Sequence, residues 1–231
     1  MTSPPRQLTL DWPHEPSFAR EDFLAAPSNR EALAAIDRWP NWPGRMLLMA
    51  GPQGAGKSHL AALWARKTGA IAIRGEALAG LDAPPEGEAL LVEDADRVGA
   101  GEARLFHLLN AGLARGAWLL MTARAAPDSW GLTTPDLLSR LRLAPIVRLA
   151  TPDVDLIEAV LFKLFSDRQL QVEPSVAAYV AHRIERSIGA AREIVAQLDR
   201  EALARGRRVT RAMAAEILRA AEDASGGRDS P

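Results

Sequence analysis

A glycine-rich segment near residue 50 has the residue types and spacing of a phosphate-binding loop. Glycines let several backbone N–H groups close around phosphate oxygens, while a lysine followed by a hydroxyl residue supplies a cation and a metal ligand. The segment follows an apolar run and precedes a helical pattern, which is the context that such a loop requires. It consists of Gly51, Pro52, Gln53, Gly54, Ala55, Gly56, Lys57 and Ser58, directly followed by His59.

This loop predicts a binding site for ADP or ATP with Mg²⁺. Lys57 should reach the β- and γ-phosphates, and Ser58 should ligate the metal. We expect the whole loop and His59 to contact the nucleotide. The alternative interpretation is a glycine-rich turn between a strand and a helix that binds no ligand.

Two acidic residues end the apolar run Ala89-Leu90-Leu91-Val92. At the end of a buried strand, one carboxylate can bind Mg²⁺ or its water while the next lies near the attacking water. By position, Glu93 is the expected metal ligand and Asp94 the candidate catalytic base. Two solvated acids at a strand end would give the same pattern.

Short apolar runs alternate with helical patterns in the first two thirds of the chain, which predicts an α/β fold with a parallel sheet flanked by helices. The expected strands are 46–50, 70–73, 89–92, 117–122 and 146–149. The expected helices of this part are 28–39, capped by Ser28 or Asn29, 57–68 and 102–115. From residue 151 only helical patterns follow, at about 153–168, 174–185, 188–205 and 210–222, which predicts a C-terminal all-α lid domain.

These patterns divide the chain into four parts. We expect a flexible tail over 1–16, a P-loop nucleotide-binding domain over 17–150, a helical lid over 151–223 and a disordered end over 224–231.

Composition argues against several classes of protein. The formal net charge of −1 gives no overall attraction to nucleic acid or to an anionic membrane. The chain has no cysteine, which excludes disulfides and thiolate metal sites. No apolar run is long enough to span a bilayer, so we expect a cytoplasmic protein without a membrane partner. The one dense basic cluster, Arg205-Gly206-Arg207-Arg208, is either a solvated helix end or a contact for DNA phosphates.

Several later blocks resemble those of AAA+ proteins related to the replication initiator DnaA. Trp118-Leu119-Leu120-Met121-Thr122 is similar to the strand that ends in sensor 1, which implies that Thr122 senses the phosphates. Leu137-Leu138-Ser139-Arg140-Leu141 is similar to the block with the arginine finger, which implies a catalytic role in trans for Arg140. Ser187 to Glu193 is similar to the lid helix that supplies sensor 2, here Arg192. Phe23, Leu24 and Asn29 lie in a segment similar to the one that lines the adenine pocket.

The first residues narrow the resemblance further. Gln7, Leu8, Leu10 and Trp12 are similar to the short peptide that binds bacterial replication proteins to the DNA polymerase sliding clamp. A clamp peptide before a DnaA-like core resembles the Hda regulators of DnaA. The alternative interpretation is a proline-bounded strand that packs on its own domain.

The Hda resemblance implies a function without requiring much intrinsic ATPase activity. The protein would bind ADP or ATP with Mg²⁺, contact DNA indirectly through the clamp, and stimulate hydrolysis of DnaA-bound ATP, which inhibits re-initiation of replication. A homo-oligomer is also compatible with a finger that acts in trans. The departure from the usual pattern is Glu93, where most relatives have Asp. The rival functions are a self-sufficient P-loop ATPase, a helicase-loader-like AAA+ protein and a non-catalytic adaptor.

Overall fold

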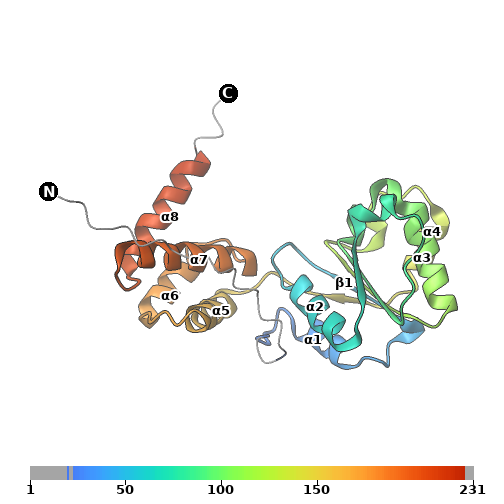
Figure 1. The fold of residues 1–231 in the computed structure, drawn as a ribbon, viewed down its shortest axis with the longest axis horizontal. Coiled ribbons are helices and arrows are strands. Elements are labelled where there is room, and N and C mark those ends of the chain that lie inside the picture. Colours follow the sequence, from blue (N-terminus) through green and yellow to red (C-terminus); the bar gives the residue numbers. More distant parts are fainter. Residues whose placement is uncertain (1–19, 21–22, 227–231) are drawn as a thin grey trace. The chain divides into compact units, whose positions relative to one another are not determined.

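The computed structural model describes residue 20 and residues 23–226. Their contacts divide the chain into two compact units, with the division between Thr151 and Pro152. From the sequence, we expected the division one residue earlier. Each unit has its own hydrophobic core. Figure 1 shows the helices and strands of both units.

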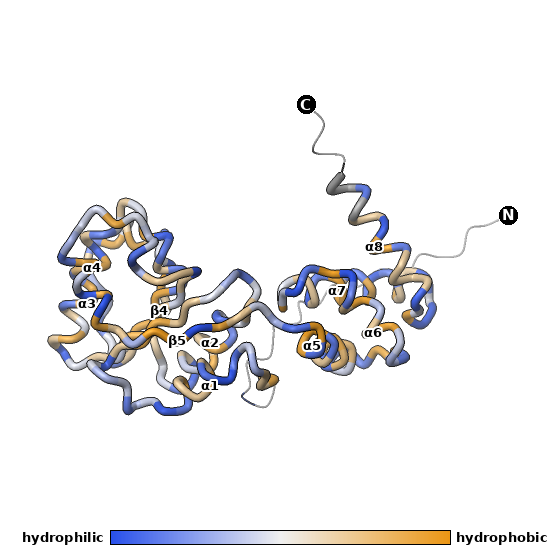
Figure 2. The backbone as a smooth tube through the Cα atoms, turned by 180° about the vertical axis from the view of Figure 1, so that it is seen from behind, coloured by the Kyte–Doolittle hydropathy of each residue, from blue (hydrophilic) through white to orange (hydrophobic). Residues whose placement is uncertain are grey.

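The first unit is a parallel five-stranded sheet in the order β2-β3-β4-β1-β5, which confirms the predicted α/β fold. The phosphate loop follows β1, next to the centre of the sheet. The strands are β1 (Met46–Ala50), β2 (Ile71–Arg74), β3 (Ala89–Glu93), β4 (Trp118–Ala123) and β5 (Ile146–Arg148). Figure 2 shows apolar colours along β4, which lies between β1 and β3.

Both faces of the sheet are buried, which explains the near-continuous apolar runs of the central strands. Alternate side chains of β1 enter different cores: Leu47 and Met49 pack in one, and Met46 and Leu48 in the other. Helices α1 (Arg30–Asp37) and α2 (Lys57–Thr68) cover the first face. Helices α3 (Glu102–Ala114) and α4 (Pro135–Leu141) cover the second.

Stacked indoles fix α1 and α2 against each other. The rings of Trp42 and Trp64 stack with centroids 5.3 Å apart, and Trp42 Nε1 donates a 2.7 Å hydrogen bond to the carbonyl of Ala35. Since α2 begins with Lys57, this packing also fixes the helix that carries the phosphate-loop lysine.

The second unit is the predicted all-α bundle. Its helices are α5 (Val154–Asp167), α6 (Pro174–Ala181), α7 (Ile188–Arg205) and α8 (Arg211–Gly226). Asp153 caps α5, and Ser187 caps α7 through a 3.0 Å bond to the N–H of Ala190. None of the helices in the described ranges is long and apolar enough to cross a membrane.

Helix ends account for most differences from the sequence expectations. Helix α1 is shorter than 28–39, and neither expected cap forms a side-chain cap bond to it, because the Asn29 amide is bonded elsewhere. Helix α6 ends at Ala181 instead of 185, since the chain must extend to place Ser187 as the cap of α7. Helix α8 continues to Gly226, beyond the expected end at 222, so residues 224–226 are helical where we expected disorder.

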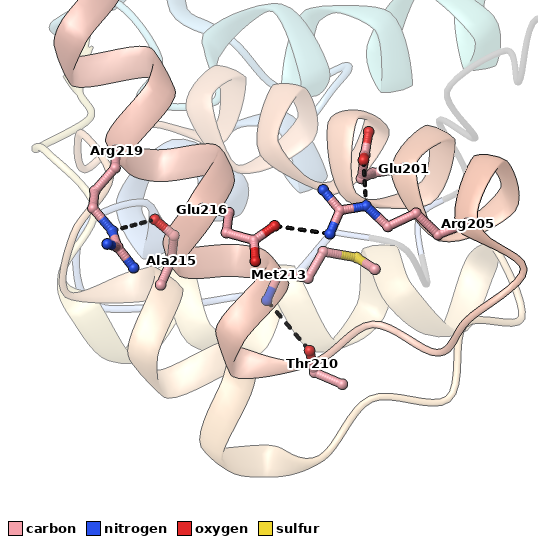
Figure 3. Close-up of polar contacts among 7 residues, drawn as sticks. All are labelled: Glu201, Arg205, Thr210, Met213, Ala215, Glu216 and Arg219. Atoms are coloured by element: carbon pink, nitrogen blue, oxygen red, sulfur yellow. Dashed lines mark hydrogen bonds and ion pairs between the residues drawn. The ribbon is translucent and has the colours of Figure 1, made fainter.

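The basic cluster at the end of α7 is partly neutralised within the bundle. Arg205 forms ion pairs with Glu201 on its own helix and, at 2.8 Å, with Glu216 on α8 (Figure 3). Thr210 caps α8 by accepting a hydrogen bond from the N–H of Met213. Arg205 therefore joins two helices, which favours the solvated helix end over a DNA contact for this residue.

A carboxylate on α3 fixes the start of α4. Glu102 accepts hydrogen bonds from the backbone N–H groups of Thr133 at 3.0 Å and Thr134 at 2.8 Å. These bonds hold the pKa of Glu102 below its usual value, and the bond from the N–H of Thr133 has the largest effect. Since Leu137 and Leu141 are fully buried, α4 is fixed both at its start and along its inner face.

We predict that Glu102→Gln lowers the free energy of unfolding of the first unit by about 0.5–1 kcal/mol at pH 7, since the group is partly exposed. A depressed folded pKa stabilises above the unfolded pKa, about 4.3, and this stabilisation is lost as pH falls through the folded pKa. The difference from wild type should therefore be constant from pH 7 to about 5 and shrink in more acidic solution.

Denaturant unfolding followed by tryptophan fluorescence measures this difference, because no tryptophan lies beyond residue 130. Glu86→Gln is the matched control: this exposed carboxylate lies in a loop of the same unit and makes no hydrogen bond to a described residue. A pH-independent difference for Glu102→Gln would contradict the charged hydrogen bond.

Candidate functional site

The phosphate loop depends on a glycine where two strands and the loop meet. A Cβ added to Gly51 would lie 2.4 Å from the carbonyl oxygen of Leu149, just after β5. The N–H of Gly51 donates a 3.1 Å hydrogen bond to the carbonyl of Ala123, the last residue of β4. Gly54 and Gly56 have positive φ angles of 75° and 99°, which side chains disfavour. The geometry of the loop therefore requires glycine at position 51 and favours it at positions 54 and 56.

Lys57 lies inside this loop, with 7% of its surface exposed. Its Nζ donates hydrogen bonds to the carbonyls of Gly51 at 2.7 Å and Pro52 at 2.8 Å. Burial lowers the pKa of Lys57, while the carboxylates of Asp94 and Asp96 oppose the shift. The lysine is therefore already held in place within the loop. Its charge also interacts with Asp94 and Asp96, which follow β3, two strands away from β1 in the sheet.

Asp94, just after β3, has an unusual backbone conformation and is held by two contacts. Its backbone is left-handed, with φ 49° and ψ 49°. Its N–H donates a 2.9 Å hydrogen bond to Oγ1 of Thr122, whose side chain is completely buried. A Cβ added to Gly75 would lie 2.3 Å from the carbonyl oxygen of Asp94, so only glycine fits there. Thr122, the expected sensor 1 residue, thus holds the backbone of the candidate base.

The residues expected to bind Mg²⁺ are of the type that holds this ion together with phosphate and water. Glu93 is half-buried at the end of β3, and Ser58 is exposed in the first turn of α2. One carboxylate oxygen of Asp96, Oδ1, is buried without a hydrogen-bond partner among the described residues. Although the described residues hold no cluster of three metal-ligating side chains, Mg²⁺ commonly needs only one or two from the protein.

The segment before α1 lies against the phosphate loop. The buried ring of Phe23 contacts His59 edge-to-face at 5.3 Å, and its Cε2 is 3.8 Å from a Cβ added to Gly56. Asn29 holds the turn, since its amide accepts from the N–H of Ala26 and donates to the carbonyl of Leu24, both at 2.9 Å. Phe23 and His59 thus lie together at the loop, and their contact with a nucleotide stays a prediction. Whether Leu24 and Asn29 line an adenine pocket stays a prediction.

Arg140 lies in the last turn of α4, half-exposed. Within the described ranges, no acidic residue pairs with it. Its neighbour Arg142 is different, because both Nε and Nη2 donate to Asp128. Of the two arginines at this helix end, Arg142 is engaged locally and Arg140 is available to an external anion.

Arg192 lies near the start of α7 in the helical unit. Burial, and then repulsion by Arg168, lower the pKa of Arg192. Arg168 itself pairs with Asp199 at 3.5 Å. An anion beside Arg192 would relieve this repulsion, as a sensor 2 role requires, and that role stays a prediction.

Sequence reasoning missed two residues at the phosphate loop, Asp96 and Arg124. Arg124 follows β4 directly, and its Nη2 lies 3.4 Å from Oε1 of Gln53. The charges of both residues affect the pKa of Lys57: that of Asp96 raises it, and that of Arg124 lowers it. For Arg124 the available signal was its position, because residues that directly follow parallel strands gather at one edge of the sheet. Asp96 gave no such signal, since β3 already ends at Glu93.

Gln7, Leu8, Leu10 and Trp12, the expected clamp-binding residues, are outside the described residues. A pocket of about 580 Å³ lies at the opposite edge of the sheet, where Ala89 and Trp118 begin β3 and β4. Its indoles are covered by cations, with Arg45 5.0 Å from the Trp118 ring centroid and Lys67 5.4 Å from that of Trp39.

Comparison with known proteins gives a fold but no family. No protein-family model and no curated protein match the sequence. Domain III of the replication initiation protein DnaA from Thermotoga maritima matches with a TM-score of 0.80 and 19% identity, over 89% of this chain and 97% of that chain.

Two larger proteins match over part of their length. AMPPCP-bound DnaA from Aquifex aeolicus has a TM-score of 0.68 and 13% identity, over 78% of this chain and 64% of that chain. The RuvB Holliday junction branch migration motor of Thermotoga maritima has a TM-score of 0.60 and 19% identity, over 76% of this chain and 61% of that chain. The chain therefore spans slightly less than two thirds of these two proteins, and it shares the fold of DnaA domain III.

Proposed function

We propose that this protein is a DnaA-related AAA+ regulator that binds ADP or ATP with Mg²⁺ and stimulates hydrolysis of DnaA-bound ATP. The observation that carries the proposal is Arg140, a cation without a described carboxylate partner, at the end of a helix fixed by Glu102 and by two buried leucines. The similarity to DnaA domain III supports it, because a shared fold lets two chains pack as neighbouring AAA+ subunits do.

The protein's own nucleotide would be held by backbone N–H groups of the loop and by Lys57. That lysine already forms two hydrogen bonds to loop carbonyls. Phosphate oxygens could replace these carbonyls as acceptors, and the lysine charge, which is already buried, would not have to leave water. Mg²⁺ would neutralise phosphate charge, with Ser58 and Glu93 as its protein ligands. A bound nucleotide would stabilise the unit that presents Arg140.

Arg140 would act on nucleotide held by DnaA. An arginine supplied by a neighbouring subunit stabilises negative charge that develops on the transferred phosphoryl group. For this role the guanidinium must be solvent-accessible and its helix rigid, and α4 meets both conditions. The sliding clamp would bring the two proteins together on DNA through residues 7–12, which makes the contact with DNA indirect.

A self-sufficient ATPase is the second candidate, and the fixed position of Asp94 favours it. Thr122 and Gly75 hold the Asp94 backbone, as a catalytic base would require. The two functions differ in measurable output: the regulator needs DnaA for rapid phosphate release, whereas the ATPase releases phosphate alone.

We predict that Lys57→Ala weakens ATP and ADP binding by about 10- to 100-fold, because charged hydrogen bonds to phosphate are lost. Isothermal titration calorimetry with the full chain measures this, and thermal unfolding checks that the variant folds. Unchanged affinity would overturn the assignment of the loop as the nucleotide site.

We predict that Arg140→Ala reduces stimulated phosphate release from ATP-loaded DnaA by about 100-fold or more, since an arginine finger contributes about 10³–10⁵ in rate. The assay contains DNA-loaded clamp, and the affinity of the variant for its own nucleotide should equal that of wild type.

Arg142→Ala is the matched control, two residues away on the same helix end. Its exposed pair with Asp128 contributes little, so stimulation should fall by less than about threefold. Equal losses in both variants would indicate a general effect of charge at this helix end and would refute a specific finger. Rapid phosphate release by the wild-type protein without DnaA would instead favour the ATPase.

We predict that the double variant Leu10→Ala, Trp12→Ala loses clamp binding by about 100-fold or more, because two apolar anchors of a short peptide are removed. Surface plasmon resonance on immobilised clamp measures this affinity. Pro13→Ala, just outside the proposed peptide, should bind as wild type does. Clamp binding that survives the double variant would show that residues 7–12 are not the clamp peptide.

A further inference from the structure

Arg124 is fixed by its backbone at the mouth of the phosphate loop. The residue before it, Ala123, accepts the 3.1 Å hydrogen bond from the N–H of Gly51, the first residue of the loop. The next residue, Ala125, accepts a 2.9 Å hydrogen bond from Nε1 of Trp130. Arg124 therefore lies between two anchored residues, and its Cα cannot move far from the loop.

The side chain of Arg124 is exposed and lies beside the loop. Its Nη2 is 3.4 Å from Oε1 of Gln53, a neutral acceptor that orients the guanidinium without matching its charge. Within the described ranges no carboxylate forms an ion pair with Arg124. Its charge acts on Lys57, the other cation of the loop, and adds to the effects that lower the pKa of that lysine.

Thr122, two residues earlier, is placed differently. Its side chain is completely buried, and its hydroxyl accepts the hydrogen bond from the N–H of Asp94. Thr122 therefore binds a backbone N–H group, whereas the charged group of Arg124 lies in solvent beside the loop. Arg124 is thus the residue after β4 that can contact a ligand directly.

We propose that Arg124 is a phosphate-binding residue that contacts the terminal phosphate of a nucleotide bound to the same chain and so favours a triphosphate over a diphosphate. The proposal rests on nucleotide binding at this loop, as proposed above. Two cations near each other without a shared anion repel, and a polyphosphate between them converts that repulsion into attraction. A guanidinium can also donate two parallel hydrogen bonds to one phosphate, which an ammonium cannot.

The preference for the terminal phosphate follows from which groups are already in place. Loop N–H groups surround the phosphates that a diphosphate also has, and Lys57 is expected to reach the β-phosphate as well as the γ-phosphate. Arg124 lies outside the loop, and its guanidinium contacts the exposed side chain of Gln53. An additional phosphate beyond the loop would therefore meet Arg124, and ADP would lose little when the arginine is absent.

The test compares affinities of the full-length protein for AMPPCP and for ADP, both with Mg²⁺, by isothermal titration calorimetry. AMPPCP is a triphosphate analogue that avoids hydrolysis during the titration. We expect Arg124→Gln to weaken AMPPCP binding about tenfold or more, the usual effect of losing charged hydrogen bonds, and to change ADP binding by less than about twofold. Arg124→Lys, which keeps the charge but not the paired donors, should lie in between.

Arg66→Gln is the matched control, an exposed arginine in the last turn of α2, and it should bind both nucleotides as wild type does. Thermal unfolding confirms that each variant folds. Wild-type affinity of Arg124→Gln for AMPPCP, or an equal loss for both nucleotides, would overturn the proposal while leaving nucleotide binding intact. A wild-type protein that binds neither nucleotide would refute the nucleotide site itself, and the role of Arg124 with it.

Discussion

The close approach of Gly51 to two strand ends is the constraint on which the site depends. Its N–H is bonded to the carbonyl of Ala123, and its missing Cβ makes room for the carbonyl of Leu149. These contacts join the ends of β4, β1 and β5 at one point of the sheet. Any side chain at Gly51 would separate β5 from the loop, so the position of Lys57 and the tether of Arg124 would both be lost.

The charges at this edge are balanced across strands that are distant in sequence. Lys57 follows β1 and Arg124 follows β4, while Asp94 and Asp96 follow β3. Because β4 lies between β1 and β3, its end separates the acids from the loop, and Thr122 connects β4 to the acid side. The parallel order of the strands therefore gathers two cations and two acids, which are distant in sequence, at one edge of the sheet.

The central strands and the phosphate loop could be predicted from sequence because their signals are local. A strand buried on both faces must be apolar throughout, and β1 and α2 accordingly have the expected bounds. What could not be predicted depends on residues far apart in sequence. The carbonyl of Asp94 has room only because residue 75 is glycine, the start of α4 is held by Glu102, and the place of Arg124 beside the loop is seen in its contact with Gln53. Helix ends failed for a related reason: the Asn29 amide had a competing use in the turn before α1.

An exposed arginine without an acidic partner is by itself weak evidence for function, since Arg66 and Arg30 are also exposed and make no ion pair with a described residue. Arg124 and Arg140 differ from them in how their backbones are held. Unrelated contacts on both sides fix Arg124, and Glu102 with buried leucines fixes the helix of Arg140. A rigid backbone lowers the entropic cost of holding a long side chain against a phosphate, so the same guanidinium binds more strongly there than on a mobile surface. The fixed backbone, more than the free charge, is therefore what distinguishes these two arginines as candidates for phosphate recognition, one in the same chain and one in a neighbour.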